Sequence, residues 1–432
     1  MHGRQRLDRR SPTIAEPRCE SPLRRRPAVR LCTLEPPRDG PEPARLSAVG
    51  HNDVMPGANL RRVPLARPSI GARERELVEQ VLASGVLALG PFAERFEEGI
   101  AESAGRRFGV SVSSGTAGLH LVVRALELGE GDEVITTPFS FVASANCLLY
   151  ERVRPRFVDI EEETLGLDPD LIAAAAGPRT KGLLPVHAFG KPCQIVEIEQ
   201  IAQDRGWALV EDACEALGSR IGDRPMGSFG SASVFAFYPN KQITTGEGGV
   251  VVTDDADLAS QFRSLRNQGR DEDGTWLRHL RLGYNYRLDE LSAAVGVAQL
   301  ERRTELAMGR ARVVERYEAA LAGRPWLRLP RVSPGESIDW FVYVVRLDAS
   351  IDRGRLIDDL DRLGVPSRPY FSPLHLQPLY RELIGHRPGD FPVTERIAAT
   401  TLALPFFPDM SGDDVDYVAA ALDDVVAGQF AT

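Results

Sequence analysis

From Arg61 onward, apolar and polar positions follow a regular order along the chain. Apolar residues at helical spacing predict amphipathic helices over 72–84 and 92–104. Strands and helices then alternate. Short apolar runs predict strands at 108–112, 133–136, 156–158, 182–185, 208–210 and 249–253, and helical patterns occur at 143–150, 169–176, 195–204 and from the turn 113–116 through 128. This alternation is typical of a mainly parallel sheet covered by helices on both faces.

The pattern changes in the last third of the chain. One long helix is expected over 287–322, followed by a strand at 340–347, a helix at 353–363 and a terminal helix at 413–426. We therefore expect an α/β fold with a large domain of mainly parallel sheet at 59–310 and a small C-terminal α/β domain at 311–432.

Residues 1–58 lack this periodicity and are rich in Arg and Pro. Such a segment cannot bury enough apolar surface to offset the entropy lost on ordering, so it is expected to be a disordered N-terminal tail. Two other interpretations stay open: translation begins at Met55, or the segment is a basic interaction arm. No apolar h-region follows the basic residues, so it does not match a secretory signal.

The composition excludes several classes of protein. The formal net charge of −9 argues against a nucleic-acid partner, which requires clustered positive charge. No stretch approaches about 18 consecutive apolar residues, so no membrane span is expected. The five cysteines are odd in number and include no CxxC pair, which predicts neither a disulfide framework nor a metal site and suits the cytoplasm.

Three segments at the ends of predicted strands carry candidate chemistry, because open α/β sheets bind ligands at the carboxyl ends of their strands. The first is Ser113–Ala117, which follows a strand and opens a helix. Its free backbone N–H groups and the helix dipole form a natural phosphate seat. A simple serine N-cap would give the same pattern without a ligand.

The second segment, Val210–Glu215, brings carboxylates to the end of a buried strand. Such an acid can cap the next helix, bind a metal or pair with a cationic heterocycle. A pyridoxal ring needs one carboxylate at its ring nitrogen, because the negative charge keeps that nitrogen protonated and the ring able to accept electrons.

The third segment places Lys241 between an aromatic run, Phe235–Tyr238, and a glycine-rich turn, Thr244–Gly249. Most lysines lie on solvated surfaces among other charges. Aromatic and glycine-rich surroundings instead remove water from the amine, which favours the neutral form that attacks an aldehyde.

Seven stretches together resemble the DegT/DnrJ/EryC1/StrS family of sugar aminotransferases. They are SSGTAGLHL, TPFSFVASAN, VEDACEALG, FAFYPNKQITTGEGG, GYNYRLDELSAAVGVAQL, PLHLQPLY and LALPFFP. The resemblance covers roughly residues 62–428. It implies an aminotransferase of fold type I that depends on pyridoxal 5'-phosphate (PLP) and works as a homodimer with active sites shared between subunits.

The resemblance also implies roles for individual residues. Lys241 would hold the cofactor as a Schiff base and move protons. Asp212 would pair with the pyridinium nitrogen, and Phe141 would stack on the ring. The phosphate would be held by Gly115, Thr116 and Ala117, and by Asn285 from the neighbouring subunit. The apolar positions of the helix after Asn285 are Leu291, Ala294, Val295, Val297 and Leu300, and we expect part of this surface to pack against the partner.

Two positions depart from the family pattern. Ala236 stands where a phosphate-binding serine is frequent, and Glu215 stands where Gln or His is frequent near the ring hydroxyl. A carboxylate at that place repels a phenolate oxygen unless it is protonated or turned away. Two histidines are also of interest: His187, at a strand end, favours packing or hydrogen bonding over catalysis, and for His375 a sugar contact stays open.

The implied reaction is a two-stage amino transfer. An amino-acid donor, L-glutamate by resemblance, gives its amino group to the cofactor, which passes it to a nucleotide-linked ketosugar for cell-surface polysaccharide or secondary-metabolite biosynthesis. Three alternatives stay open: an aminotransferase for a cyclitol such as an inosose, a PLP-dependent sugar dehydratase, and a non-catalytic PLP-binding regulator. The dehydratases carry histidine where Lys241 stands, and a regulator would need a DNA-binding module.

Overall fold

The computed structural model describes residues 61–271, 275 and 277–430. The predicted N-terminal tail at 1–58 and the alternative start at Met55 lie outside the described residues.

A seven-stranded sheet forms the centre of the described chain. Its order is β1 (Phe108–Val112), β9 (Gly249–Thr253), β8 (Ala232–Ala236), β5 (Ala208–Asp212), β4 (Thr180–Leu184), β2 (Glu133–Thr136) and β3 (Arg154–Phe157). The strands from β8 to β3 pair in parallel, whereas β9 runs antiparallel to both β8 and β1. The prediction of a mainly parallel α/β sheet is confirmed. The predicted strands did not include β8, which lies immediately before the Lys241 segment.

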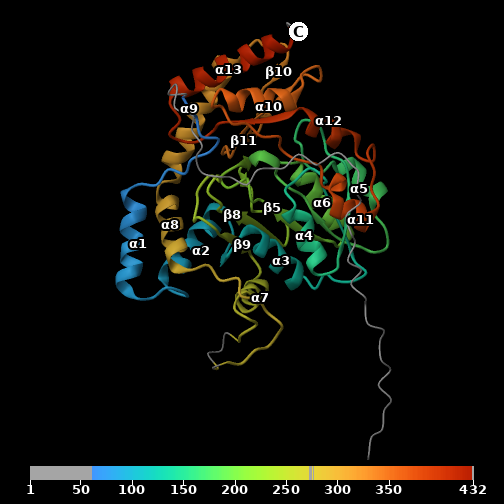
Figure 1. Cartoon of the computed structure of the whole chain (residues 1–432). Helices are drawn as coiled ribbons and strands as arrows, with labels where there is room; N and C mark the ends of the chain where they lie inside the picture. The colour runs from blue at the N-terminus through green and yellow to red at the C-terminus, as the bar shows by residue number, and fades with distance from the viewer. Residues whose placement is uncertain (1–60, 272–274, 276, 431–432) are drawn as a thin grey trace, which may run out of the picture. The chain divides into compact units, whose positions relative to one another are not determined.

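Helices cover both faces of this sheet, because its buried strands are apolar on both sides (Figure 1). Neighbouring residues Leu209 and Val210 of β5 enter opposite cores. One core is closed by α3 (Gly115–Ala125), α4 (Ala143–Tyr150) and α7 (Ala256–Arg266). The other is closed by α2 (Pro91–Ser103), α6 (Ile195–Arg205) and α8 (Glu290–Glu301), with α1 (Ala72–Ser84) packed on α8. The short α5 (Pro169–Ala175) precedes β4.

The helix predicted over 287–322 is two helices, α8 and α9 (Arg303–Leu321). They separate at Arg302, whose backbone is not helical (φ −101°, ψ 6°). The Arg302 side chain donates from Nη1 to Oε1 of the buried Glu74 on α1, at 2.8 Å. This contact with another helix fixes the end of α8, and it is invisible in the apolar pattern of the segment.

A smaller antiparallel sheet follows, made of β10 (Leu327–Arg328), β12 (Tyr343–Leu347) and β13 (Thr401–Leu404). Helices α9, α10 (Arg353–Arg362) and α13 (Gly412–Phe430) enclose a separate core over it. Helices α11 (Pro378–Ile384) and α12 (Pro392–Thr400) lie between β12 and β13 in the chain. In Figure 1, α9, α10 and α13 lie together in the upper part of the view, near the C-terminus.

A third small sheet pairs β11 (Glu336–Ser337) with β6 (Arg220–Ile221), which pairs with β7 (Arg224–Pro225). It joins the C-terminal part to the loop after β5. The predicted boundary at 310 falls within α9, a helix that belongs to both cores. The domain limits therefore stay a prediction.

Candidate functional site

The three segments singled out in the sequence meet around Gly115, the first residue of α3. A Cβ added to Gly115 would lie 2.7 Å from the Cβ of Ala236 and 3.0 Å from the Sγ of Cys214. Ala236 ends β8 and belongs to the aromatic run of the lysine segment, and Cys214 belongs to the acidic segment at the end of β5. The close approach leaves no space for a side chain at Gly115, so a glycine is needed here for the three segments to pack this closely.

The first turn of α3 offers donors for an anion. The N-cap Ser114 accepts a hydrogen bond through Oγ from the Ala117 N–H, at 3.1 Å. The N–H groups of Gly115 and Thr116 have no acceptor within the helix, as is general for a first turn. Together with the helix dipole, they suit a phosphate group. Because Ala236 lacks a hydroxyl, β8 adds no side-chain donor beside this turn.

Asp212 ends β5 on the side of the sheet that faces α3 and α4. Its side chain is 4% exposed. Its Oδ2 accepts a 2.7 Å hydrogen bond from the Ser144 hydroxyl of α4, and its Oδ1 accepts from the Cys214 N–H at 3.2 Å. The carboxylate is thus oriented from two sides. Sequence reasoning missed Ser144, although it lies three residues after Phe141 in the quoted TPFSFVASAN stretch.

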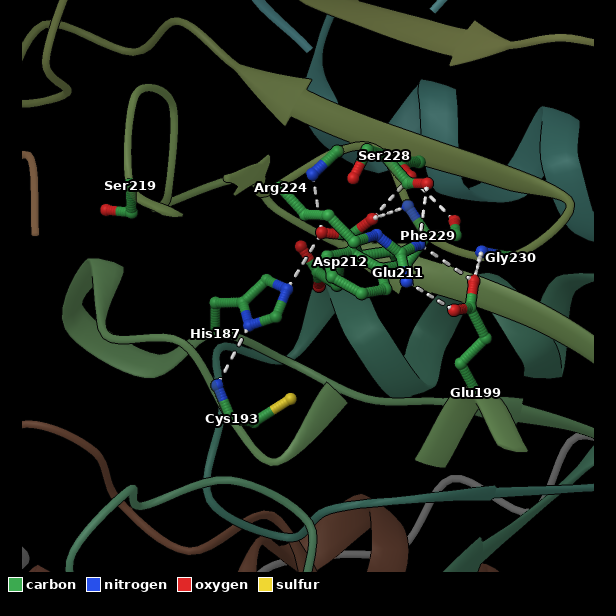
Figure 2. Close-up of polar contacts among 12 residues, drawn as sticks. His187, Cys193, Glu199, Glu211, Asp212, Ser219, Arg224, Ser228, Phe229 and Gly230 are labelled. Atoms are coloured by element: carbon green, nitrogen blue, oxygen red, sulfur yellow. Dashed lines mark hydrogen bonds and ion pairs between the residues drawn. The ribbon is translucent and has the colours of Figure 1, made fainter. Parts of the chain in front are cut away.

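Glu211, the neighbour of Asp212, points to the opposite face because side chains alternate along a strand. Burial alone would raise its pKa, but hydrogen bonds from His187, from the Gly227 N–H and from the Ser233 hydroxyl hold the pKa of Glu211 below its ordinary value. Figure 2 shows His187 between this carboxylate and Cys193. Its Nδ1 accepts from the Cys193 N–H at 3.1 Å. His187 therefore has a buried hydrogen-bonding role, as expected.

Lys241 lies in the turn after β8, and its side chain is 12% exposed. Its Nζ donates to Glu215 Oε1 at 3.2 Å and lies 4.0 Å from the ring centroid of Phe341. Glu215 Oε2 accepts from the Phe189 N–H at 2.9 Å. The carboxylate is therefore directed at the lysine. Phe341 comes from the C-terminal part of the chain, and no sequence signal separated it from an ordinary core residue.

Cys214 lies near the phosphate turn and near the side chains of Asp212 and Lys241, and its thiol is uncharged. Burial, and next the neighbouring Asp212 carboxylate, raise the pKa of the thiol well above its ordinary value. The thiol thus stays neutral at physiological pH, beside both the phosphate turn and the acidic segment.

Phe141 lies two residues before the start of α4, and 62% of the residue is exposed. Its backbone oxygen accepts a 3.4 Å hydrogen bond from the Ser144 hydroxyl, which also contacts Asp212. One serine thus connects the exposed aromatic to the buried acid. An exposed aromatic side chain suits stacking on a planar ring.

Asn285 is not brought into this group by a side-chain hydrogen bond. Its side chain is exposed and has no hydrogen-bond partner in the part of the chain that the structure describes. The backbone oxygen of the next residue, Tyr286, accepts from the Ser113 N–H at 2.8 Å. The loop therefore runs beside the strand that leads into the phosphate turn, and the role of Asn285 stays a prediction.

His375 is completely buried. Its Nε2 is 2.9 Å from Glu395 Oε1, and its ring packs against Phe391 with centroids 4.7 Å apart. These contacts favour a packing role over a sugar contact.

Across residues 61–430, apart from the gaps at 272–274 and 276, no cluster of three His, Cys, Asp or Glu side chains has the arrangement of a metal site. None of the helices in the same ranges is both long enough and apolar enough to span a membrane.

Comparison with known proteins decides the family. The model of the DegT/DnrJ/EryC1/StrS aminotransferase family matches residues 68–423. This chain belongs to that family. It is an aminotransferase, and its cofactor is PLP; the structures related to it include a PLP form. The family resemblance and the type I fold expected from the sequence are confirmed.

Two curated relatives and one solved structure illustrate the similarity of this aminotransferase to others. The spore coat polysaccharide biosynthesis protein SpsC of Bacillus subtilis is 36% identical over 379 residues, 85% of this chain and 97% of SpsC. The GDP-perosamine synthase of Caulobacter vibrioides is 36% identical over 374 residues, 85% of this chain and all of that enzyme. The structure of DesI with its TDP-sugar product has a TM-score of 0.79 and 34% identity, over 86% of this chain and 94% of DesI.

The residues of this aminotransferase fit its cofactor. At Gly115 the first turn of α3 packs against the acidic and lysine segments, and the free N–H groups of Gly115 and Thr116 suit the phosphate. The carboxylate of Asp212 is buried, oriented and available for a ring nitrogen. The amine of Lys241 lies in a partly covered position beside Glu215.

Proposed function

We propose that this aminotransferase moves an amino group from an amino acid, L-glutamate, to a nucleotide-linked ketosugar. The observation that carries the proposal is the contact of the α3 turn with the acidic and lysine segments at Gly115. The substrate class rests on similarity, because GDP-perosamine synthase and DesI are both named with a nucleotide-linked sugar. Similarity to SpsC supports a place in polysaccharide biosynthesis.

Bound PLP supplies an aldehyde and a pyridine ring that accepts electrons. Lys241 would hold the cofactor through Nζ. Its amine, when free, would move the proton at the α-carbon of the donor, first as a base and then as an acid. Glu215, at 3.2 Å from Nζ, orients this amine.

The remaining site residues bind and orient the cofactor. Asp212 would keep the ring nitrogen protonated, and Phe141 would stack on the ring. The backbone N–H groups of Gly115, Thr116 and Ala117 would bind the phosphate. The Ala117 N–H also donates a hydrogen bond to the Ser114 hydroxyl oxygen.

We also propose a cytoplasmic homodimer whose active sites combine both subunits. The described cysteines, Cys147, Cys193 and Cys214, are free, which suits a reducing compartment. Near Asn285 the side chains of Leu280 and Leu282 are 48% and 75% exposed. A partner subunit would remove this apolar surface from water and bring Asn285 to the partner's phosphate turn.

The sequence-based reason for the dimer needs correction. The apolar positions of α8 were expected to exceed what one core requires. In the structure, Ala294 and Val297 are buried in the core, and Leu291 and Leu300 pack against it, because α8 lies against α1 and α2. Val295 is half-buried and belongs to no core cluster. The main support for a dimer therefore comes from the loop before α8.

The chain contains only three lysines, Lys181, Lys191 and Lys241. Chemical trapping of the cofactor on a lysine can therefore give only three labelled positions, which are easily distinguished. Lys191 is buried like Lys241, but its Nζ donates to the Arg331 backbone oxygen and lies 3.9 Å from Glu336. Borohydride reduction of the purified holoenzyme should fix the cofactor on the peptide that contains Lys241. Lys241→Ala should abolish trapping, and Lys191→Gln should preserve it. Trapping on Lys191 or Lys181 would refute the assignment.

Substrate assays test the other half of the proposal. The enzyme is given L-glutamate and a panel of nucleotide-linked 3-keto and 4-keto sugars, with an inosose as comparison, and aminated products are measured by mass spectrometry. Amination of a nucleotide sugar is expected. Amination of the inosose alone would replace the substrate class with a cyclitol.

A further inference from the structure

The turn that carries Lys241 is held by a buried arginine from the helix α9. Arg310 donates from Nη2 to the backbone oxygen of Lys241 and from Nη1 to that of Gln242, both at 2.8 Å. A guanidinium group presents its donors in a rigid planar fork, so two adjacent carbonyl groups bound by it cannot rotate independently. The contact fixes the peptide plane that follows Lys241.

The chemistry of Arg310 is unusual for a residue that only fills space. Arg310 is 6% exposed, and within the described ranges it forms no ion pair. Burial lowers its pKa to about 10, while Asp339 and Asp409 oppose this effect from a longer range. Burying a guanidinium costs free energy that an apolar side chain of similar size would not cost. The two hydrogen bonds from Arg310 to the backbone oxygens of Lys241 and Gln242 partly offset this cost.

Arg310 stands where α9 passes from one core to the other. Leu306 packs in the core of the large sheet, and Val313 packs in the core of the small sheet. Gly309 lies against the Pro408 backbone, where a Cβ would be 2.7 Å from the carbonyl oxygen. The backbone of Arg310 is therefore fixed on both sides, and the guanidinium is a firm support for the turn.

The same turn organises the partners of the lysine. Gln242 donates from Nε2 to the backbone oxygens of Glu215, at 2.5 Å, and Asp339, at 3.0 Å. Glu215 accepts from Lys241 Nζ, and Phe341 lies two residues after Asp339. A rotation of the Lys241–Gln242 peptide would therefore disturb the turn and both neighbours of the amine together.

We propose that Arg310 is a positioning residue for Lys241: it locks the lysine turn so that Nζ is directed at Glu215 and at the ring of Phe341. The inference rests on the proposed role of Lys241, which the trapping experiment tests separately. Arg310 acts through the backbone oxygens of Lys241 and Gln242.

The first test measures access to Lys241 in the cofactor-free full chain. The protein is acetylated with an N-hydroxysuccinimide ester, and peptide mass spectrometry gives the rate at Lys241 relative to the exposed Lys181. Arg310→Met should raise this ratio about ten-fold, the value expected when one charge-assisted hydrogen bond is lost. Arg310→Lys, which keeps the charge but lacks the fork, should lie between. Arg312→Met, two residues away on the exposed side of α9, should leave the ratio unchanged.

The second test uses the holoenzyme. The visible absorbance of the lysine-linked cofactor is titrated with pH, and Arg310→Met should move the midpoint by about one pH unit because the surroundings of Nζ change. If Arg310→Met melts earlier but keeps the wild-type labelling ratio and midpoint, Arg310 is structural only and the proposal is wrong. If Arg310→Met does not fold, Arg310→Lys decides by the same two measurements. Trapping of the cofactor on another lysine would refute the proposed function, whereas the labelling ratio would still report on the turn.

Discussion

At the scale of single residues, Ser144 determines how the Asp212 carboxylate is presented. Its hydroxyl is buried, lies 2.7 Å from Asp212 Oδ2 and also contacts the Phe141 backbone. Without it, Asp212 keeps only the hydrogen bond from the Cys214 N–H among the contacts found at its side chain. An acid that can rotate holds the ring-nitrogen proton less well.

Ser144→Ala should therefore lower kcat about ten-fold, since a hydrogen bond to a charged group contributes about 1.5–3 kcal/mol. The melting temperature should change little. Cys147→Ala is the matched control, because Cys147 is buried on the same helix and its thiol donates its hydrogen bond to the Ser144 backbone oxygen and not to Asp212. Steady-state kinetics of both variants check the prediction, and equal rates for Ser144→Ala and wild type would contradict it.

A single buried residue, Asp339, should also make the stability of the folded state depend on pH. Burial raises its pKa from 3.8 to about 6, partly opposed by Arg310 and then Arg303. Because the folded-state value is the higher one, the neutral carboxyl stabilises the folded state below about pH 4, and this contribution is lost as the pH rises through about 6.

Asp339→Asn imitates the neutral carboxyl. It should raise the free energy of unfolding by about 1–3 kcal/mol at pH 8 and leave it unchanged at pH 4. Urea unfolding at the two pH values measures this difference. The exposed Asp361→Asn on α10 should show no such dependence. A gain of the same size at both pH values would mean that packing, not ionisation, is responsible.

At the scale of elements, α2 begins without a cap of its own. Its N-cap residue, Gly90, has no side chain to accept a hydrogen bond. The carboxylate of Glu290, at the start of α8, accepts instead from the N–H groups of Gly90, Phe92 and Ala93 at 2.9–3.0 Å. A residue 200 positions away in the chain therefore satisfies the first turn of α2.

Glu290→Gln replaces an acceptor oxygen with a donor that faces N–H groups. It should lower the free energy of unfolding by about 2–3 kcal/mol, because buried donors lose an ionised partner. Glu301→Gln, on the same helix, breaks exposed ion pairs with Arg73 and Arg95 and should cost about 1 kcal/mol or less. Urea unfolding of the two variants gives the comparison, and a smaller loss for Glu290→Gln than for Glu301→Gln would refute the capping role.

At the scale of the whole molecule, the exposed position of Asn285 predicts that active sites are completed across a dimer. Lys241→Ala and Asn285→Asp should each be nearly inactive. Mixed and allowed to exchange subunits, they should recover activity towards about a quarter of wild type, because random pairing leaves that share of sites without a lesion.

Size-exclusion chromatography confirms that the mixture is dimeric before the assay. If each active site is built within one chain, every site in the mixture carries one of the two substitutions and no activity returns. That result would show that Asn285 does not contribute to the partner's active site. A mixture of Lys241→Ala with itself after the same treatment is the control for contaminating activity.

The sequence by itself determined the periodic elements and the order of the chemical motifs. Helices such as α1 and strands such as β1 match their predicted ranges, because a local pattern of apolar residues decides which face can be buried. The positions of Gly115 and Asp212 at strand ends also followed from local pattern, whereas β8, the strand before Lys241, was not predicted. The segments that carry the three residues meet in the structure because strands that run in the same direction end at a common edge of the sheet.

Only the tertiary structure decided which distant side chains support this edge. Ser144, Phe341 and Arg310 were not singled out, since each looks like an ordinary helix or core residue in its own neighbourhood. The division of the long helix at Arg302 depends on Glu74, more than 200 residues earlier. Hydrogen bonds and ring contacts between remote segments depend on the packing of whole elements, and a local pattern of apolar and polar residues does not encode that packing.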